Sequence, residues 1–375
     1  MDIKRKWEEF KVSWQPRIKE WKFMLKRMSE SPLAIAGLII ILAFVAIACM
    51  APILAPPQGP NPFILPSDTE ISVLTTQPTP PTVRHIFGTA TGEAAAGQYD
   101  IYYGCIWGTI NAFRVGILVV AISLIIGLII GTAAAYYGGA LDEILMRFTD
   151  IIIAFPGLVL AMALVIAFPT VIPIDITQTI LILSIILSIL FAALKPERKL
   201  LLPTIIILAV TLYLYINNPI FLSLNLSKLD KVLISLSLVG WPSYARLIRG
   251  EVLRVKNEDY VEAAKAAGCS DLRVIIKHII PNAIYPVIIV STLDIGSIVL
   301  TAAALSFLGI GAEPNFADWG NIISMSRNWV SKPELLMAHY HTFLIPGIFI
   351  TLFVLGWNLL GDALRDILDP MIRRR

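Results

Sequence analysis

The sequence has little charge for its length. Charged residues make up only 15% of its 375 residues, whereas a soluble domain carries about 25%. Hydrophobic residues make up 57%, more than a soluble globule of this size could bury. A bilayer accommodates such a chain because it is itself an apolar solvent. The net charge of +3 gives no reason to expect a nucleic-acid partner. These proportions therefore indicate an integral membrane protein.

Several chemical signatures are also missing. The three cysteines, Cys49, Cys105 and Cys269, have neither a metal-ligand spacing nor a disulfide framework. Cys49 and Cys105 could pair near the outer face, although three unpaired thiols are the simpler interpretation. His339 and His341 form an i,i+2 pair, which is a poor metal chelator by itself. Neither a resident metal nor a resident cofactor is therefore expected.

The sequence contains no glycine-rich phosphate-binding loop followed by Lys and Ser or Thr, so any ATP would be bound by another chain. A cleavable signal peptide is not recognisable either. The first apolar run begins only near Leu33 and is long enough to span a membrane. It is therefore interpreted as an uncleaved anchor.

Apolar runs of about 20 residues can cross a bilayer core about 30 Å thick. Such runs predict an all-α polytopic membrane helical bundle of about eight spans. The runs lie at 33–50, 113–137, 151–168, 176–194, 200–216, 232–247, 283–305 and 342–360.

The expected organisation follows the same runs. Trp7, Trp14 and Trp21 recur among many Lys and Arg residues, which is typical of a helix lying on membrane lipid; an ordinary helix packed on a partner is the alternative. We divide the chain into this interfacial helix (1–32), a first transmembrane helix (33–52), a proline-rich external loop (53–104), a transmembrane core (105–168), an inserted transmembrane hairpin (169–230) and a transmembrane core with a coupling loop at 258–282 (231–375).

Basic residues predict the orientation. With the N-terminus inside, the cluster Lys195–Lys199 and the cations of 246–282 also fall inside, as the positive-inside rule requires. Both termini are then cytoplasmic. The segment 176–216 must be a whole hairpin or not span at all, because an odd number of crossings would invert everything after it. Asn225 begins a glycosylation sequon that falls outside.

The polar stretch between Arg249 and Asn282 is the most informative part of the chain. Asp259–Ala267 is alanine-rich and favours a helix whose small side chains let another surface approach closely. Gly268 allows a sharp stop. Ser270 or Asp271 is expected to cap a second helix, with Ile275, Ile276 and Ile279 on its apolar side and Pro281 at its end. A helix–turn–helix between two spans is suited to docking in a groove of a partner protein.

This stretch resembles the EAA loop of binding-protein-dependent ABC importer permeases. In that family the loop contains the coupling helix, which sits on the ATP-binding subunit. The resemblance assigns ATPase coupling to Tyr260, Glu262, Ala263, Ala264, Gly268, Ile275, His278 and Pro281, supported by Arg246 and Arg249. His278 could equally be a cation at a helix terminus.

Other segments resemble the C-type permease of the dipeptide, oligopeptide and nickel branch. They are Trp241-Pro242, Tyr244-Ala245-Arg246, Leu305–Gly311, Asn358–Asp362, Leu368-Asp369-Pro370, Gly138-Gly139, Asp142-Glu143, Met146-Arg147, Asp150 and Ala154–Gly157. Family members usually have six spans, so 176–216 looks like an insertion. The segment Gly97–Gly104 matches the family pattern only loosely.

The resemblance implies a type I ABC importer permease fold in a prokaryotic cell membrane. The chain would be a transporter subunit and not an enzyme. Its expected partners are a second homologous permease, two ATP-binding subunits that hold ATP and Mg, and an external substrate-binding protein. Peptide is the expected cargo; oligosaccharide and nickel remain alternatives.

An ion-gradient secondary transporter is the rival class. Such proteins keep ionisable residues in mid-membrane for function, whereas the spans here are almost free of them. Asp294 is the clear exception. It could line a translocation pathway, or it could be a helix-facing carboxylate near Ser291 and Ser297.

Overall fold

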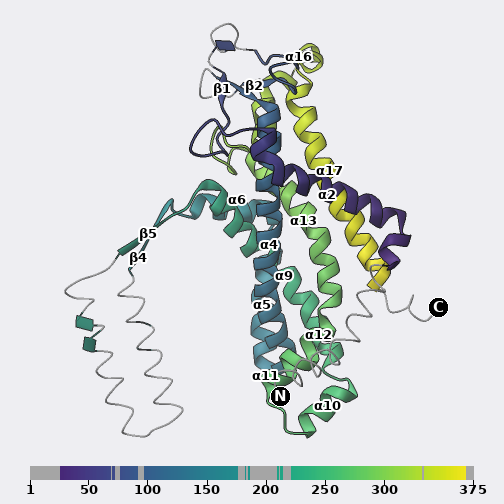
Figure 1. The fold of residues 1–375 in the computed structure, drawn as a ribbon. Helices are drawn as coiled ribbons and strands as arrows, with labels where there is room; N and C mark the ends of the chain where they lie inside the picture. Colours follow the sequence, from purple (N-terminus) through teal and green to yellow (C-terminus); the bar gives the residue numbers. More distant parts are fainter. Residues whose placement is uncertain are drawn as a thin grey trace, which may run out of the picture. The chain divides into compact units, whose positions relative to one another are not determined.

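The computed structural model describes residues 26–68, 70–71, 77–91, 97–175, 182, 185, 209–210, 212–213, 221–331 and 333–368. Its residues group into two units, one formed by Met1–Val165 with Val232–Arg375 and the other by Ile166–Lys231. Figure 1 traces the chain through both units.

The first unit is a bundle of long helices. Four of the described helices are long and apolar enough to cross a membrane: α2 (Pro32–Leu54), α4 (Ile101–Tyr137), α13 (Tyr285–Phe307) and α17 (His341–Leu368). The helices α5 (Gly139–Ala154) and α6 (Gly157–Ala167) are together apolar enough to cross but meet at a 93° bend. They add a fifth crossing if the bent pair forms one span. The helix α9 (Lys228–Val255) is not in this set, since serine, proline and charged residues interrupt its apolar run.

The predicted helical bundle is therefore confirmed, while the count of eight spans stays a prediction. The spans differ from the expected ones in two respects. The second begins at Ile101, inside the expected loop, because Asp100 caps the helix by accepting hydrogen bonds from the amides of Tyr102 and Tyr103. The expected third span, 151–168, is instead divided between α5, which begins at Gly139, and α6; the bend between them lies where Phe155 is extended and Pro156 follows it.

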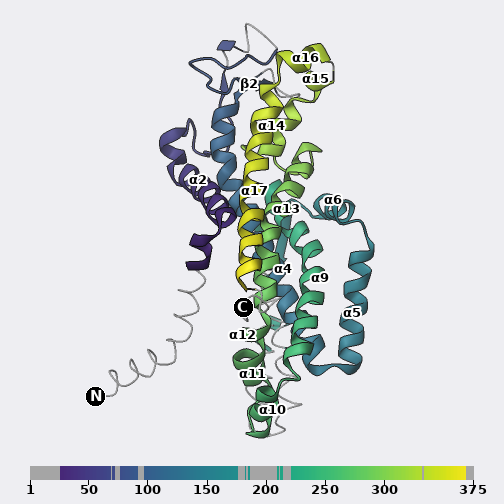
Figure 2. The same ribbon diagram turned by 90° about the vertical axis from the view of Figure 1, so that its right-hand side faces the viewer.

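The expected external loop contains secondary structure. β1 (Ser67–Asp68), β3 (Gln98–Asp100) and β2 (Thr89–Thr91) form an antiparallel sheet in that order, in which Ala90 and Ser67 both pair with Tyr99. Three short helices, α14 (Trp319–Met325), α15 (Arg327–Val330) and α16 (Pro333–Ala338), follow α13. Figure 2 shows them at the same end of the bundle as β2.

The second unit contains β4 (Val171–Asp175) and β5 (Phe221–Asn225), which pair antiparallel with Val171 opposite Asn225. The sequence predicted only a transmembrane hairpin at 169–230. Most of that hairpin lies outside the described residues, as do Lys195–Lys199 and the first 25 residues of the interfacial helix. Asn225 is exposed at the end of β5.

Two buried clusters hold the first unit together. The aromatic cluster joins α2, α4, α14 and α17 and includes Phe44, Trp107, Trp319 and Phe353. The aliphatic cluster joins α4, α9 and α13 to the short helices at the other end of the bundle. Its fully buried members are Ala135, Ile248, Val252, Val255, Val261, Val274, Ile279 and Val287.

Candidate functional site

The helix α10 (Asp259–Ala266) has one buried side. Val261 is fully buried in the aliphatic cluster, against the end of α9. Glu262, Ala263 and Lys265 are exposed, and Ala264 is half-buried. One residue therefore anchors the helix, while its small and charged side chains face outward.

A tight turn ends α10. Gly268 has a φ of 80°, in the left-handed region that favours glycine. The amide of Cys269 bonds to the carbonyl of Ala264 at 3.1 Å, and that of Gly268 to the carbonyl of Lys265 at 2.9 Å. This pair of bonds is a Schellman motif, which caps the last carbonyls of a helix. The sequence anticipated the position of this turn.

The second helical segment is longer than expected. It runs through α11 (Asp271–Val274), the π-helical turn η1 (Ile275–Ile279) and α12 (Ile280–Ala283). Pro281 does not end it, because proline is tolerated in the first turn of α12. Ser270 occupies the N-cap position without a side-chain capping bond. Asp271 instead accepts a hydrogen bond from the Tyr136 hydroxyl of α4 at 2.6 Å.

The apolar residues of this segment face two ways. Ile279 is fully buried and Ile275 is half-buried, but Ile276 is 56% exposed and Leu272 is 68% exposed. Tyr260 is 43% exposed. The expectation that all three isoleucines share one apolar side is therefore wrong, because the π turn rotates the segment. Sequence reasoning missed Leu272, although its i,i+4 spacing to Ile276 could have indicated it.

The remaining predicted residues of the loop lie on this segment. His278 and Pro281 are half-buried. The carbonyl of His278 accepts a hydrogen bond from Asn282 Nδ2 at 2.7 Å. His278 is thus part of the π turn, a feature that often marks functional sites.

Arg246 and Arg249 lie on α9, before the loop, and both contact α5. Arg249 donates from Nε and Nη2 to the two carboxylate oxygens of Asp142, each at 2.6 Å. Arg246 donates to Asp150 Oδ1 at 2.6 Å. Lys256, which follows α9, donates to the carbonyl of Ala135 in α4 at 2.7 Å.

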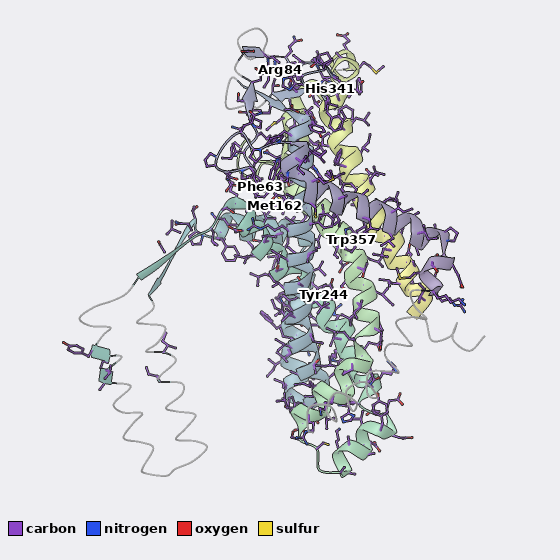
Figure 3. The ribbon with its side chains drawn as sticks, viewed as in Figure 1. Phe63, Arg84, Met162, Tyr244, His341 and Trp357 are labelled. Atoms are coloured by element: carbon purple, nitrogen blue, oxygen red, sulfur yellow. The ribbon has the colours of Figure 1, made fainter. Side chains whose placement is uncertain are left out.

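Asp294 lies on α13 and is half-buried. Its Oδ2 accepts a hydrogen bond from the Tyr244 hydroxyl of α9 at 2.8 Å (Tyr244 is labelled in Figure 3). Ser291 and Ser297 instead donate to backbone carbonyls of their own helix. Asp294 therefore joins two helices through Tyr244, a partner that sequence reasoning did not name.

An apolar cavity of about 380 Å³ lies beside these helices. Its lining comes from three elements: Gly157 and Leu158 of α6, Leu236, Val239 and Gly240 of α9, and Ile298, Leu300, Thr301 and Ala304 of α13.

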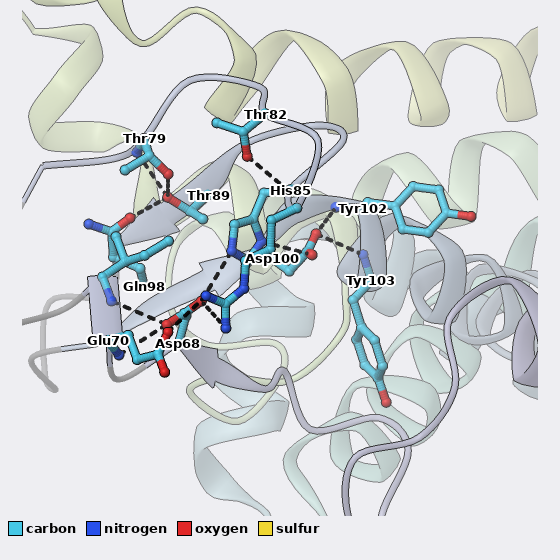
Figure 4. A network of polar contacts seen from close by, with 12 residues as sticks. Asp68, Glu70, Thr79, Thr82, His85, Thr89, Gln98, Asp100, Tyr102 and Tyr103 are labelled. Carbon is cyan, nitrogen blue, oxygen red and sulfur yellow. Dashed lines mark hydrogen bonds and ion pairs between the residues drawn. The ribbon is translucent and has the colours of Figure 1, made fainter.

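A polar network fastens the small sheet to the start of α4 (Figure 4). The His85 ring lies between Asp100 Oδ2 at 3.0 Å and Asp68 Oδ2 at 3.2 Å. Arg84 reaches Asp68 at 3.4 Å. Burial by itself would raise the pKa of Asp68, but bonds from the Ile71 amide and His85, with the Arg84 charge, hold it below its usual value.

His339 lies close to the backbone of Pro78 and His341 close to that of Thr79 and Thr89, and their ring centroids are 6.3 Å apart. Burial lowers the pKa of His339. Within the described ranges, no group of three or more His, Cys, Asp or Glu side chains is arranged to hold a metal.

The architecture defines a class of protein, a multi-pass membrane helix bundle with a helix–turn–helix loop between α9 and α13. Comparison with known proteins identifies the family. A model described as "Binding-protein-dependent transport system inner membrane component" matches residues 199–374. A second, "N-terminal TM domain of oligopeptide transport permease C", matches residues 19–73.

Curated relatives match almost the whole chain. The dipeptide transport system permease protein DppC of Alkalihalophilus pseudofirmus is 31% identical over 95% of this chain and 91% of its own length. The oligopeptide transport system permease protein OppC of Bacillus subtilis is 28% identical, over 94% of this chain and 90% of its own. The glutathione transport system permease protein GsiD of Pectobacterium atrosepticum is 28% identical, over 94% and 92%.

The chain belongs to the family of binding-protein-dependent ABC transport permeases. It is therefore a multi-pass membrane protein and a transporter subunit rather than an enzyme, and separate subunits hydrolyse ATP. Membership in this family decides against an ion-gradient secondary transporter.

Proposed function

We propose that this chain is the C-type permease subunit of an importer whose cargo is peptide. The curated relatives are named as dipeptide, oligopeptide and glutathione permeases, which supports peptide over the oligosaccharide and nickel alternatives. The second homologous permease would complete the pathway, and an external binding protein would deliver the peptide. The chain would lie in a prokaryotic cell membrane with both termini in the cytoplasm.

The observation that carries the proposal is a set of exposed apolar side chains on the loop 258–282: Leu272 and Ile276 at i,i+4 spacing, and Tyr260 on α10. We call it the docking face. Large exposed apolar side chains outside a membrane span mark interaction sites when they gather on one element. The loop is anchored from behind by Val261 and Ile279, so the docking face can be pressed into a groove without collapsing.

The proposed mechanism is mechanical. Two ATP-binding subunits close on ATP and Mg and displace the docking face. The aliphatic cluster links α10 and α11 to α4, α9 and α13, so the displacement moves these helices as packed bodies. The cavity between α6, α9 and α13 and the carboxylate of Asp294 would then line part of the pathway.

The test replaces the docking face. Leu272→Glu with Ile276→Glu should reduce retention of the ATP-binding subunit during co-purification on the order of tenfold or more, because two apolar side chains lose their burial. Glu262→Lys should abolish uptake of a labelled dipeptide by the reconstituted transporter while leaving membrane insertion intact.

The matched control is Met337→Glu. Met337 is 80% exposed but lies on α16, at the opposite end of the bundle. It should retain the ATP-binding subunit fully. Undiminished retention in the Leu272 and Ile276 variant would refute docking through this face.

A further inference from the structure

The helix α5 is hinged at both of its ends. Its N-cap is Gly138 and its first residue is Gly139, two consecutive glycines with φ of 68° and 59°. A Cβ built on either would meet nothing within 4 Å, so packing does not explain these glycines. At its other end the chain bends by 93° at Phe155 and Pro156 into α6. Glycine pairs and proline breaks are where helices change direction.

Between these hinges α5 has little packing of its own. Thr149 is its single buried residue. Among the described residues, none of α5 belongs to the aromatic or the aliphatic cluster. Ile144 and Ile151 are 66% and 59% exposed. Something other than core packing must therefore set its position.

The contacts between α5 and α9 are specific. Figure 2 shows the two helices running side by side. Asp142 pairs with Arg249 and Asp150 with Arg246, each with a contact of 2.6 Å. Phe148 stacks on Trp241, with ring centroids 6.0 Å apart. The two ion pairs follow opposite orders along the two helices, as antiparallel neighbours require, and the Phe148–Trp241 stack adds a third contact between them.

The two ion pairs differ in strength. The Arg249–Asp142 pair is bidentate, and its side chains are only 35% and 20% exposed. Such a pair holds orientation as well as distance. The Arg246–Asp150 pair is 52% and 57% exposed and has one contact, so it contributes less. The first pair is therefore the main fastening.

This fastening connects α5 to the loop 258–282, which carries the docking face and is called the docking loop below. The helix α9 ends at Val255, four residues before α10 begins at Asp259. The end of α4 is fixed to the same region by the bonds Tyr136–Asp271 and Lys256–Ala135. The cavity is lined by α9 and also by Gly157 and Leu158 of α6, the helix that continues from α5.

We propose that Asp142 and Asp150 are positioning residues that make α5 follow α9, so that movement of the docking loop reaches α6 and the wall of the cavity. This inference rests on the proposed coupling function. It assigns a role in transport to two acidic residues outside the loop. The glycine and proline hinges let α5 move, and the ion pairs determine what it moves with.

The experiment uses the full transporter with its ATP-binding subunits. Spin labels at Ile144 on α5 and Ser243 on α9, both exposed, report the distance between the helices without and with bound ATP. We expect one narrow distance distribution in both states. Arg249→Met should broaden it and lower dipeptide uptake per ATP hydrolysed on the order of tenfold.

Two further variants separate positioning from general damage. The charge swap Asp142→Arg with Arg249→Asp should restore the narrow distribution and most of the uptake that Arg249→Met loses. The conservative change Asp142→Glu, made alone in the native protein, should preserve both. Arg254→Met is the matched control, because Arg254 lies on α9 but pairs with Glu251 of the same helix at 2.9 Å. It should leave both readouts unchanged.

The outcomes also distinguish this inference from the docking proposal. An unchanged distribution and unchanged uptake in Arg249→Met, with the ATP-binding subunit still bound, would overturn the positioning role alone. If the Arg249→Met transporter no longer binds its ATP-binding subunit, the positioning role is overturned as well, because the Arg249–Asp142 pair would then maintain the shape of the docking loop and not the position of α5. The docking proposal fails separately, if the Leu272 and Ile276 variant binds normally.

Discussion

The two ends of the helix bundle are held together by different chemistry. In the aromatic cluster, the ring of Trp319 lies 5.9 Å from Phe44, 5.9 Å from Phe349 and 5.6 Å from Phe353. Its indole N–H donates to the carbonyl of Cys105 at 3.0 Å, and that of Trp107 to Ala55 at 2.9 Å. Such bonds allow one arrangement, because a rotated ring would leave its donor buried without a partner.

The aliphatic cluster near the docking loop has less directional packing. Apart from Tyr244, whose hydroxyl donates to Asp294, its buried members are alanine, valine and isoleucine side chains, which carry no hydrogen-bonding groups. Apolar side chains can slide to another packed arrangement at low cost, provided that volume is conserved. The comparison therefore indicates a rigid end that maintains the fold and a more adjustable end, which is what the proposed coupling requires.

The largest effect should come from the rigid end. Trp319→Ala removes the ring and its hydrogen bond, and we expect it to lower the free energy of unfolding by about 3–5 kcal/mol. Val255→Ala in the aliphatic cluster should cost about 1–2 kcal/mol, since less apolar area is lost. Cys105 is fully buried, so a thiol dye labels it only when the protein unfolds. Labelling on heating, in a protein with Cys49 and Cys269 replaced by Ser, therefore measures the unfolding of both variants. Equal losses would contradict the comparison.

An intermediate effect is expected at the turn of the docking loop. Gly268→Ala places a side chain at a φ of 80°, which costs about 1–2 kcal/mol. Dipeptide uptake should fall with the loss of stability, because the turn orients α10. Gly250→Ala is the control: Gly250 lies within α9, and a Cβ there meets nothing within 4 Å. It should leave unfolding and uptake unchanged or slightly improved, and an equal loss in both variants would refute the turn argument.

The smallest effect concerns the polar network beside the rigid end. The pKa of Asp68 is below its usual value of 3.8 in the folded protein, so its stabilising contribution is complete above that value. The contribution is lost as the pH falls through the lower, folded pKa. Hydrogen exchange in β1–β3 should accelerate below about pH 3.8 in the native protein and much less so in Asp68→Asn. Identical pH dependence in both would show that Asp68 does not fasten the sheet.

Local features of the chain were predictable from sequence. The shortage of charge indicated a membrane protein, because apolar area on that scale needs a bilayer. The alanine-rich run and Gly268 located α10 and its turn, since helix propensity and left-handed glycine act over a few residues. The family followed from motifs within the same segments.

Contacts between distant residues were decided only by the tertiary structure. The pair of Arg249 with Asp142 spans 107 positions, and that of Tyr244 with Asp294 spans 50. Neither partner could be chosen from the sequence, because the choice depends on which helix faces meet. The early start of α4 and the bend between α5 and α6 have local causes, the Asp100 cap and Pro156, but the apolar runs alone did not reveal them. The low charge that marks this chain as a membrane protein is thus evident from the sequence alone, because composition needs no structure to be counted. The partners of its half-buried charged side chains required the fold, because they depend on how the helices pack.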